Sequence, residues 1–367
     1  MRAPMMDASS PPPPADAGVI HPDADTTPTY CTPQPWETEL ILDDSETRPD
    51  KVSMAVADDG TIYVSFDKGN QAWFAERKVG AQWTTTSVDA AINRSTTTSA
   101  LAVDTQGRPH IVYGQNTRNQ RLEVEHHWRE AGQWTSETIH VGGGSTTISP
   151  HYLIDERDTH HITFYTGAGS SLRYASKTST GPWQLIDTGW KATFRSAPMA
   201  MDREGSVHIS FEHHQDSALG HAKLTGGVWS DSLVDDTVDL LNSSDVFIDT
   251  DNRPTIAYPH RADKAVKIAH QTDTGWEIEK VADGEAISVT AELDQEETTH
   301  LFYVQPLDSQ IVHAARRRGE TTWTTEEVAT TTRHATLSTT TTGEGTLHVV
   351  YLLVQERELH YAVRRCL

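Results

Sequence analysis

The sequence is poor in basic residues and contains no long apolar run. Its 30 Lys and Arg face 52 Asp and Glu, so the 367-residue chain carries a formal net charge of −22. A charge of this sign repels nucleic acids and anionic membranes, which argues against partners of either kind. No stretch approaches the roughly 20 consecutive apolar residues of a membrane-spanning helix, and no apolar segment typical of a signal peptide is visible. We therefore expect no nucleic-acid partner and no transmembrane segment.

The motifs of several enzyme classes are also missing. The sequence contains no Gly-rich phosphate loop, no nucleophile elbow and no cofactor fingerprint. No ligand spacing typical of a zinc site appears. We expect no cofactor and no metal, with one alternative, in which His151, His213 and His260 converge as metal ligands.

What the sequence does contain is a repeat that runs through the whole chain. Seven tryptophans recur at gaps of 47, 51, 49, 46, 47 and 47 residues, namely Trp36, Trp83, Trp134, Trp183, Trp229, Trp276 and Trp323. A near-constant period of this length indicates repeated supersecondary units, of which propeller blades are the best match.

Each interval between the tryptophans carries the same strands. The second strand of every unit ends in Tyr or Phe, as in HIVY (110–113) and HITF (161–164). The third strand ends in Ala in six units, and Glu125 is the exception. The connections between first and second strands are rich in Asp and Gly, which favours tight turns over calcium loops. We therefore predict an all-β, seven-bladed β-propeller with four-stranded antiparallel blades.

The last unit lacks its fourth strand, and a matching strand lies at the other end of the chain. PWETELILD (35–43) has the outer-strand pattern of QWTSETIHV (133–141). We predict that this N-terminal strand completes the last blade and closes the ring, which removes exposed sheet edges. The approximate blade boundaries are then 47–92, 93–143, 144–190, 191–238, 239–284, 285–330, and 331–367 together with 31–46.

Both cysteines fall at this seam. Cys366 ends the third strand of the composite blade, and Cys31 begins the segment that should lie beside it. We predict a disulfide between them, and its loop would span nearly the whole ring, for which chain entropy allows roughly 4 to 5 kcal/mol. Such a bond implies an oxidising compartment.

Residues 1–30 differ from the rest in composition. They include four consecutive prolines, several Asp and Ala, and almost no apolar run, which predicts a disordered tether. This segment resembles the spacer that follows the lipidated cysteine of some bacterial surface lipoproteins. The resemblance and the cysteine pair together favour an extracellular, periplasmic or cell-surface location.

The repeated unit also resembles a known family. DTQGRPHIVY followed by QRLEVEHHWREAGQW, with its counterparts in all seven blades, is similar to the BNR-type, sialidase-superfamily β-propellers of secreted bacterial proteins. The resemblance implies carbohydrate ligands, because that superfamily includes glycosidases, polysaccharide lyases and lectins. The Asp-boxes and the Arg-Ile-Pro motif of true sialidases do not occur here, which argues against a sialidase. Fold alone leaves the chemistry open.

Candidate functional residues are those that break the repeat. His110, His161, His208, His300 and His348 share one strand position, so we interpret them as architectural hydrogen bonders.

The loops between second and third strands do differ between blades. His213 and His260 lie two residues after the strand aromatic in blades 4 and 5, next to His214 and Arg261 respectively. Tyr165 directly follows the aromatic of blade 3.

Two inner strands also begin with unusual residues. His151 opens that of blade 3, where other blades place a small residue, and Asp245 holds the matching position in blade 5. These residues predict one site at one mouth of the ring, on blades 3 to 5, with His151, Tyr165, His213 and His260 as catalytic candidates. Four arginines precede inner strands and are candidates for binding a carboxylate or sulfate: Arg48, Arg94, Arg195 and Arg333.

Two function classes remain open. The first is an enzyme acting on an acidic polysaccharide, a lyase in which His or Tyr removes the proton α to a uronate carboxylate. A glycosidase is the weaker enzyme alternative, because paired carboxylates are needed at a defined separation. The second class is a lectin or protein-binding scaffold. A single non-repeating site favours one glycan ligand, and we expect a monomer.

Overall fold

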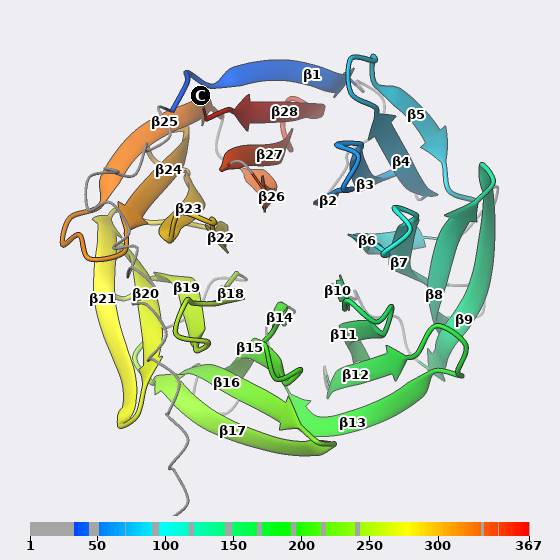
Figure 1. Ribbon diagram of the computed structural model, residues 1–367, viewed down its shortest axis with the longest axis horizontal. Coiled ribbons are helices and arrows are strands. Elements are labelled where there is room, and N and C mark those ends of the chain that lie inside the picture. The colour runs from blue at the N-terminus through cyan, green and yellow to red at the C-terminus, as the bar shows by residue number, and fades with distance from the viewer. Residues whose placement is uncertain are drawn as a thin grey trace, which may run out of the picture.

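The computed structural model describes residues 33–43, 51–69, 71–89, 95–116, 121–143, 149–166, 171–191, 196–213, 218–238, 243–331, 334–343 and 345–366. The side chains at 95–97, 116, 121, 143 and 213 lie outside this description. Within it, 28 strands form seven four-stranded antiparallel sheets, arranged as a ring around one axis (Figure 1). The predicted seven-bladed β-propeller is confirmed.

The strands of each blade are called A to D from the axis outward. Blade 1 contains β2 (Val52–Val56), β3 (Ile62–Lys68), β4 (Gln71–Arg77) and β5 (Thr84–Ser87). Blade 2 contains β6 (Ser95–Val103), β7 (Pro109–Asn116), β8 (Arg121–Glu130) and β9 (Gln133–Gly143). Blade 3 contains β10 (His151–Ile154), β11 (His160–Thr166), β12 (Ser171–Lys177) and β13 (Gln184–Lys191).

The next three blades follow the same order. Blade 4 contains β14 (Met199–Met201), β15 (Val207–His213), β16 (Ala218–Thr225) and β17 (Val228–Asp235). Blade 5 contains β18 (Asp245–Ile248), β19 (Pro254–His260), β20 (Ala265–Thr272) and β21 (Gly275–Asp283). Blade 6 contains β22 (Val289–Leu293), β23 (Thr298–Gln305), β24 (Gln310–Arg317) and β25 (Thr324–Thr330).

Blade 7 joins the two ends of the chain. Its strands A to C are β26 (Ala335–Thr342), β27 (Thr346–Leu353) and β28 (Glu358–Arg364), and its strand D is β1 (Glu37–Asp43). β1 pairs antiparallel with β28 along the rim, where the two ends of the colour scale meet in Figure 1. The backbone N–H of Gln34 donates to the carbonyl of Arg365 at 2.9 Å. Closure by the N-terminal strand is therefore confirmed.

The tryptophans pack one blade against the preceding one. The Trp134 ring of blade 2 meets Phe74 of blade 1 edge-on, with ring centroids 5.1 Å apart. Trp36 meets Phe302 of blade 6 in the same way at 5.8 Å, although 266 positions separate them. Edge-to-face pairs of this kind add to the burial of the inter-blade cores, so the period of the tryptophans is the period of the packing.

The Asp residues of the A–B connections stabilise the turns themselves. Asp104 accepts hydrogen bonds from the backbone N–H groups of Gln106 at 3.0 Å and Arg108 at 2.8 Å. The same pair of acceptor bonds recurs at Asp155, Asp202 and Asp294. Because these carboxylate oxygens satisfy turn donors, the Asp-rich loops are explained as turns.

The repeated histidines of strand B are buried and hydrogen-bonded to strand C, as predicted. Each bonds to an aromatic residue 13 or 16 positions later, and the pairs are His110 with His126, His161 with Tyr174, His208 with His221, His300 with His313, and His348 with Tyr361. They link strands inside every blade in which they occur.

The sequence alignment of the third strand was wrong in blade 2. Ala75 of blade 1 lies opposite Val64, and the corresponding strand-B residue of blade 2 is Ile111. The residue opposite Ile111 is His127, so His127 holds the alanine position and Glu125 does not. The error arose because the motif LxYA places the alanine position at Glu125, whereas two additional residues of β8 move it to His127.

Candidate functional site

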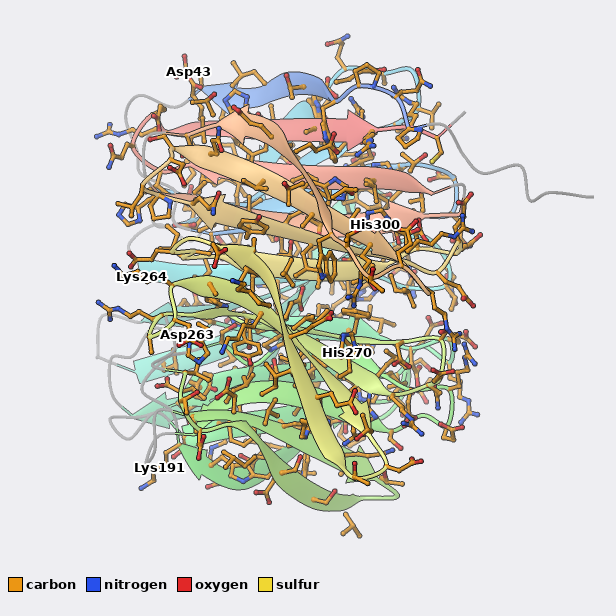
Figure 2. All side chains as sticks on the ribbon, turned by 90° about the vertical axis from the view of Figure 1, so that its left-hand side faces the viewer. Asp43, Lys191, Asp263, Lys264, His270 and His300 are labelled. Atoms are coloured by element: carbon orange, nitrogen blue, oxygen red, sulfur yellow. The ribbon has the colours of Figure 1, made fainter. Side chains whose placement is uncertain are left out.

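The ring has two faces, which Figure 2 shows from the side. Strand B leads to strand C at one face, called the BC face, toward which Asp43, Asp263 and Lys264 lie in Figure 2. Strand A turns into strand B at the other, called the AB face, and His270 and His300 lie toward it. Most of the predicted site residues belong to the BC-face ends of their strands.

One lysine interrupts a ring of hydroxyl residues at the BC face. Ser53 of blade 1 and His151 of blade 3 hold equivalent positions in strand A. Two residues before this position, the seven blades carry Lys51, Thr98, Ser149, Ser196, Ser243, Ser288 and Thr336. The Lys51 ammonium donates a hydrogen bond to the Ser149 hydroxyl at 2.7 Å. Blades 1 and 3 are not neighbours, so this bond crosses the inner end of blade 2.

His151 lies beside this pair, at the start of β10. Its Nε2 is 3.3 Å from the hydroxyl of Ser196 in blade 4. Burial, with a smaller effect of the Lys51 ammonium, lowers the pKa of His151 to about 3. The imidazole is therefore neutral at pH 7 and has a lone pair with which to accept a proton.

Tyr165 contacts Ser196, the same residue that His151 contacts. The side chain is 1% exposed, and its hydroxyl donates to the carbonyl of Ser196 at 3.3 Å. Burial, with the nearby carboxylate of Glu212, raises the pKa of Tyr165 well above its ordinary value. The phenol stays protonated and holds the backbone of the residue that contacts His151.

Two acidic side chains on inner strands carry raised pKa values. Asp245 accepts backbone hydrogen bonds from Ala291 and Val246, both at 2.9 Å, yet burial raises its pKa to about 7. Glu292 of blade 6 has its pKa raised to about 8 by burial and by the charge of Asp245. Both carboxyls thus exchange protons near neutral pH, which is a property of functional sites and also of strained architecture.

His260 belongs to a separate group. It is 1% exposed, and its Nδ1 accepts the backbone N–H of Asp263 at 3.1 Å. Its Nε2 faces the hydroxyl of Thr237 at 3.1 Å and the carboxylate of Asp235 at 3.6 Å. The structure therefore brings His151 and Tyr165 together around Ser196, and holds His260 in a different set of contacts, with Arg261 exposed beside it.

Several predicted residues cannot be located in this geometry. Arg48, Arg94, Arg195, His214, Arg333 and Cys31 lie outside the described residues, as does the side chain of His213. The disulfide stays a prediction, although Pro33 forms a β-bridge with Cys366 and so brings the chain near Cys31 to the seam.

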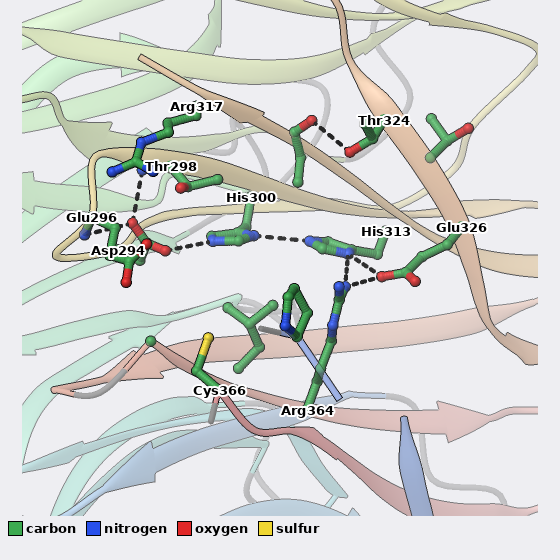
Figure 3. Close-up of a pocket in the computed structure, with 15 residues that line it drawn as sticks. Asp294, Glu296, Thr298, His300, His313, Arg317, Thr324, Glu326, Arg364 and Cys366 are labelled. Carbon is green, nitrogen blue, oxygen red and sulfur yellow. Dashed lines mark hydrogen bonds and ion pairs between the residues drawn. The ribbon is translucent and has the colours of Figure 1, made fainter. Parts of the chain in front are cut away.

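The AB face contains crevices between blades. A cavity of about 380 Å³ lies between blades 6 and 7. Figure 3 shows the chain of side chains along it, in which Asp294 contacts His300 at 3.0 Å and His300 contacts His313 at 2.9 Å. A cavity of about 160 Å³ occupies the equivalent position between blades 2 and 3. Because the crevices recur at equivalent blade junctions, their existence alone follows from the architecture.

Two groups of described residues have the composition of metal sites. One ring nitrogen from each of His110, His126 and His160 lies within 4.8 Å of the others. Burial lowers the pKa of all three to about 4, so they are neutral at pH 7. The second group is Asp89, Glu125 and His127. Sequence spacing predicted neither, because each group includes a residue from a distant part of the chain.

Sequence reasoning missed Lys51 and Glu292. A signal for both was present, since each breaks a repeat position once the strands are paired. Lys51 stands among Ser and Thr, and Glu292 stands where other blades carry Ala55, Ala102, Leu153, Ala200, Phe247 and Thr340. Finding them required the register of strands A and B, which the motif of strand B alone did not give.

No family model matches the chain, and no curated protein matches it. Solved structures are similar in fold. An ulvan lyase of polysaccharide lyase family PL25 has a TM-score of 0.63 at 13% identity, over 88% of this chain and 94% of that one. Its complex with -[GlcA(1-4)Rha3S]- gives 0.60 at 14% identity, over 83% and 90%.

A protein of unknown function from Dyadobacter fermentans DSM 18053 is similar as well. It has a TM-score of 0.56 at 12% identity, over 90% of this chain and 98% of that one. Identities this low establish the shared fold alone, so the resemblance to polysaccharide-lyase structures is confirmed at that level and the BNR assignment stays a prediction. Within the described residues, no helix has the length and hydropathy needed to cross a membrane.

Proposed function

We propose that this protein binds an acidic polysaccharide at the BC face, beside Lys51 and His151, and cleaves it by β-elimination. The observation that carries the proposal is the replacement of a hydroxyl by an ammonium at Lys51, next to a neutral imidazole at His151. An ammonium among hydroxyls complements the carboxylate or sulfate of a charged sugar. Elsewhere the protein is strongly acidic, so an anionic ligand needs such a local cation.

The chemistry follows from the charge states. Lys51 stabilises the negative charge that develops on the uronate carboxylate when the adjacent carbon loses its proton. His151 accepts that proton, the C–H electron pair forms the C=C bond, and the bond to the glycosidic oxygen breaks. The leaving oxygen takes a proton from solvent. A bound carboxylate next to His151 raises its pKa toward the ordinary range, which strengthens it as a base.

The other predicted residues have supporting parts in this proposal. Tyr165 positions Ser196 and through it His151. We retain His213 and His260 as further acid–base candidates. The proposed glycan contacts are Arg48, Arg94, Arg195, His214, Asp245, Arg261 and Arg333.

The comparison with solved structures supports the choice of substrate class. The ulvan lyase complex contains a glucuronate linked to a sulfated rhamnose, which carries both kinds of anionic group. We propose a ligand that contains uronate, with or without sulfate. Such polymers lie outside the cell, which agrees with an exported or surface protein. The alternative is a non-catalytic lectin or scaffold that uses the same face.

The test uses a panel of uronate-containing and sulfated polysaccharides. Binding is measured by calorimetry, and cleavage by the ultraviolet absorbance of the new C=C bond. Lys51→Ser introduces the residue that blades 3 to 6 carry at this position, so the fold should be unaffected. Loss of a charge-assisted hydrogen bond of about 1.5 to 3 kcal/mol should weaken binding at least tenfold.

His151→Ser separates catalysis from binding. It introduces the residue of blades 1 and 7, and we expect near-normal binding with product formation lowered at least about 100-fold, the usual contribution of a general base. Thr336→Ser, in the same hydroxyl ring, is the control and should change neither measurement. Full binding by Lys51→Ser would contradict the proposed site. Binding without product on every polymer would favour the lectin.

A further inference from the structure

At the junction of blades 2 and 3, two positions that are mostly apolar in the other blades carry polar side chains. His160 stands directly before the strand-B motif, and the equivalent residues are Ile62, Pro109, Val207, Pro254, Thr299 and Leu347. Tyr152 also breaks its repeat position, which elsewhere holds Met54, Leu101, Met199, Val246, Ala291 and Thr339. Burying two polar side chains at one junction is costly unless they have a partner there.

Three imidazoles surround one point at this junction. The ring centroids of His110, His126 and His160 are 5.1 to 5.2 Å apart in all three pairs. Tetrahedral coordination with zinc–nitrogen bonds of about 2.05 Å separates ligand nitrogens by about 3.3 Å and ring centres by about 5 Å. The ring centres already have this spacing, and the facing nitrogens of His110 and His126, at 2.9 Å, would move apart by about 0.4 Å to hold the ion.

The outer nitrogens of two of these rings face carboxylates. His110 Nε2 lies 3.2 Å from Asp104, and His126 Nδ1 lies 3.0 Å from Glu137. A neutral imidazole directs its single N–H toward such a carboxylate. The two inner nitrogens, His110 Nδ1 and His126 Nε2, then face each other at 2.9 Å with a lone pair each. Two facing lone pairs need a cation between them, either a proton or a metal ion.

Blade 6 repeats this arrangement with one difference that makes it a natural control. Its equivalent pair, His300 and His313, also lies 2.9 Å apart. As in blade 2, the outer nitrogen of the second ring faces a carboxylate, since His313 Nδ1 lies 2.8 Å from Glu326, and the Arg364 guanidinium also approaches this nitrogen at 3.3 Å. The difference is the third histidine, because Leu347 stands where blade 3 carries His160.

We propose that His110, His126 and His160 bind a divalent transition-metal ion of the zinc class. The carboxylates of Asp104 and Glu137 orient two of the ligands, in the carboxylate–histidine–metal pattern that proteins commonly use. The Tyr152 hydroxyl contacts His160 Nδ1 at 2.5 Å and His126 Nε2 at 3.3 Å, and thereby holds both rings. The fourth position faces the 160 Å³ cavity, which is large enough for a water or a small anion.

The charges around the site balance before the metal binds. The Lys177 ammonium hydrogen-bonds Glu137, and the Arg108 guanidinium hydrogen-bonds Asp104 at 2.6 Å. Each cation is therefore paired with a carboxylate, whose negative charge offsets the repulsion between that cation and the incoming metal ion. The ion would join blade 2 to blade 3 on the AB face, away from the proposed glycan site.

The test is a zinc titration of the full chain without an affinity tag, after treatment with a chelator. Calorimetry should give one tight zinc per chain, and zinc should raise the thermal midpoint. Cobalt should give the visible absorption of a tetrahedral nitrogen-ligated ion. His160→Leu introduces the residue of blade 7, so it should fold, yet weaken zinc at least tenfold and abolish the cobalt spectrum.

Two matched variants decide the location. His300→Gln alters the equivalent histidine pair of blade 6, and Glu125→Gln alters the other candidate metal group. Both variants should therefore bind zinc as tightly as the unaltered chain. The proposal is overturned if the chelator-treated chain binds no zinc at micromolar concentration, or if His160→Leu binds as tightly as the unaltered chain. It is also overturned if Glu125→Gln is the variant that loses the ion.

Discussion

Replacing Asp245 by Asn should change how stability depends on pH. The Asp245 carboxyl keeps its proton in the folded protein up to about pH 7, whereas the unfolded chain releases it near the ordinary value of 3.8. Between these two values the folded state binds more protons than the unfolded state. The free energy of unfolding must therefore fall as the pH rises through this window.

The size of the effect follows from the shift. Raising the pKa of Asp245 from 3.8 to about 7 corresponds to about 4 kcal/mol, at 1.36 kcal/mol for each pKa unit. This is an upper limit, because the side chain is half-buried and solvent reaches part of it. Asn removes the ionisation, and its side-chain oxygen can still accept the N–H of Ala291. The variant should be more stable than the unaltered chain by up to about 1.6 kcal/mol at pH 5 and by up to about 4 kcal/mol at pH 8, so the difference should widen with pH.

The assay is denaturant unfolding of both proteins at pH 5, 6, 7 and 8. The net charge of −22 makes any variant less stable at high pH through self-repulsion, so the quantity to compare is the difference between the two curves. Asp273→Asn, at a side chain that is 89% exposed, is the control and should run parallel to the unaltered chain. A parallel curve for Asp245→Asn would refute the reasoning, because it would mean that Asp245 ionises alike in both states.

Three further predictions concern the architecture. Deleting residues 1–28 should leave the thermal midpoint nearly unchanged, whereas deleting 1–46 removes β1 and should cost about 5 kcal/mol by exposing apolar surface, so equal midpoints would contradict closure by β1. Thiol titration of the non-reduced, denatured chain should find no free thiol, and reduction should lower the free energy of unfolding by no more than about 4 to 5 kcal/mol, whereas two free thiols would exclude the disulfide. His208→Gln should lower the free energy of unfolding by about 1 to 3 kcal/mol, because it breaks the bonds to His221 and Asp202, while glycan binding stays unchanged; loss of binding with normal stability would refute its architectural role.

The fold was readable from the sequence because its determinants are local and repeated. Each Trp marks the start of an outer strand, and each Asp-rich turn is stabilised by its own backbone contacts. Ring closure could also be predicted, since the missing strand and its replacement share one pattern. These features depend on residues within about ten positions of one another, or on counting whole units.

The candidate site was less predictable, because it depends on the register between strands. His151 and Tyr165 were found by their departure from the repeat, and both contact Ser196. Lys51 was not found, since its position becomes comparable with Ser149 only when each inner strand is paired with its neighbour. The same dependence produced the wrong assignment of Glu125 in place of His127.

In this chain, residues that recur at a repeat position reflect the architecture, whereas residues that depart from the repeat are the candidates for function. Both kinds occur at each face of the ring. The strand-B histidines recur and bond within their own blades, so their number reflects the architecture. His160 occurs at one junction, next to a histidine pair that exists in several blades, and this single addition supplies the third nitrogen of the proposed metal site. In the same way, Lys51 is the single residue that adds the proposed anion contact to a ring of hydroxyls. Each proposed function therefore requires one unusual residue on a repeated frame, and substitution by the residue of a neighbouring blade removes the function while retaining the frame.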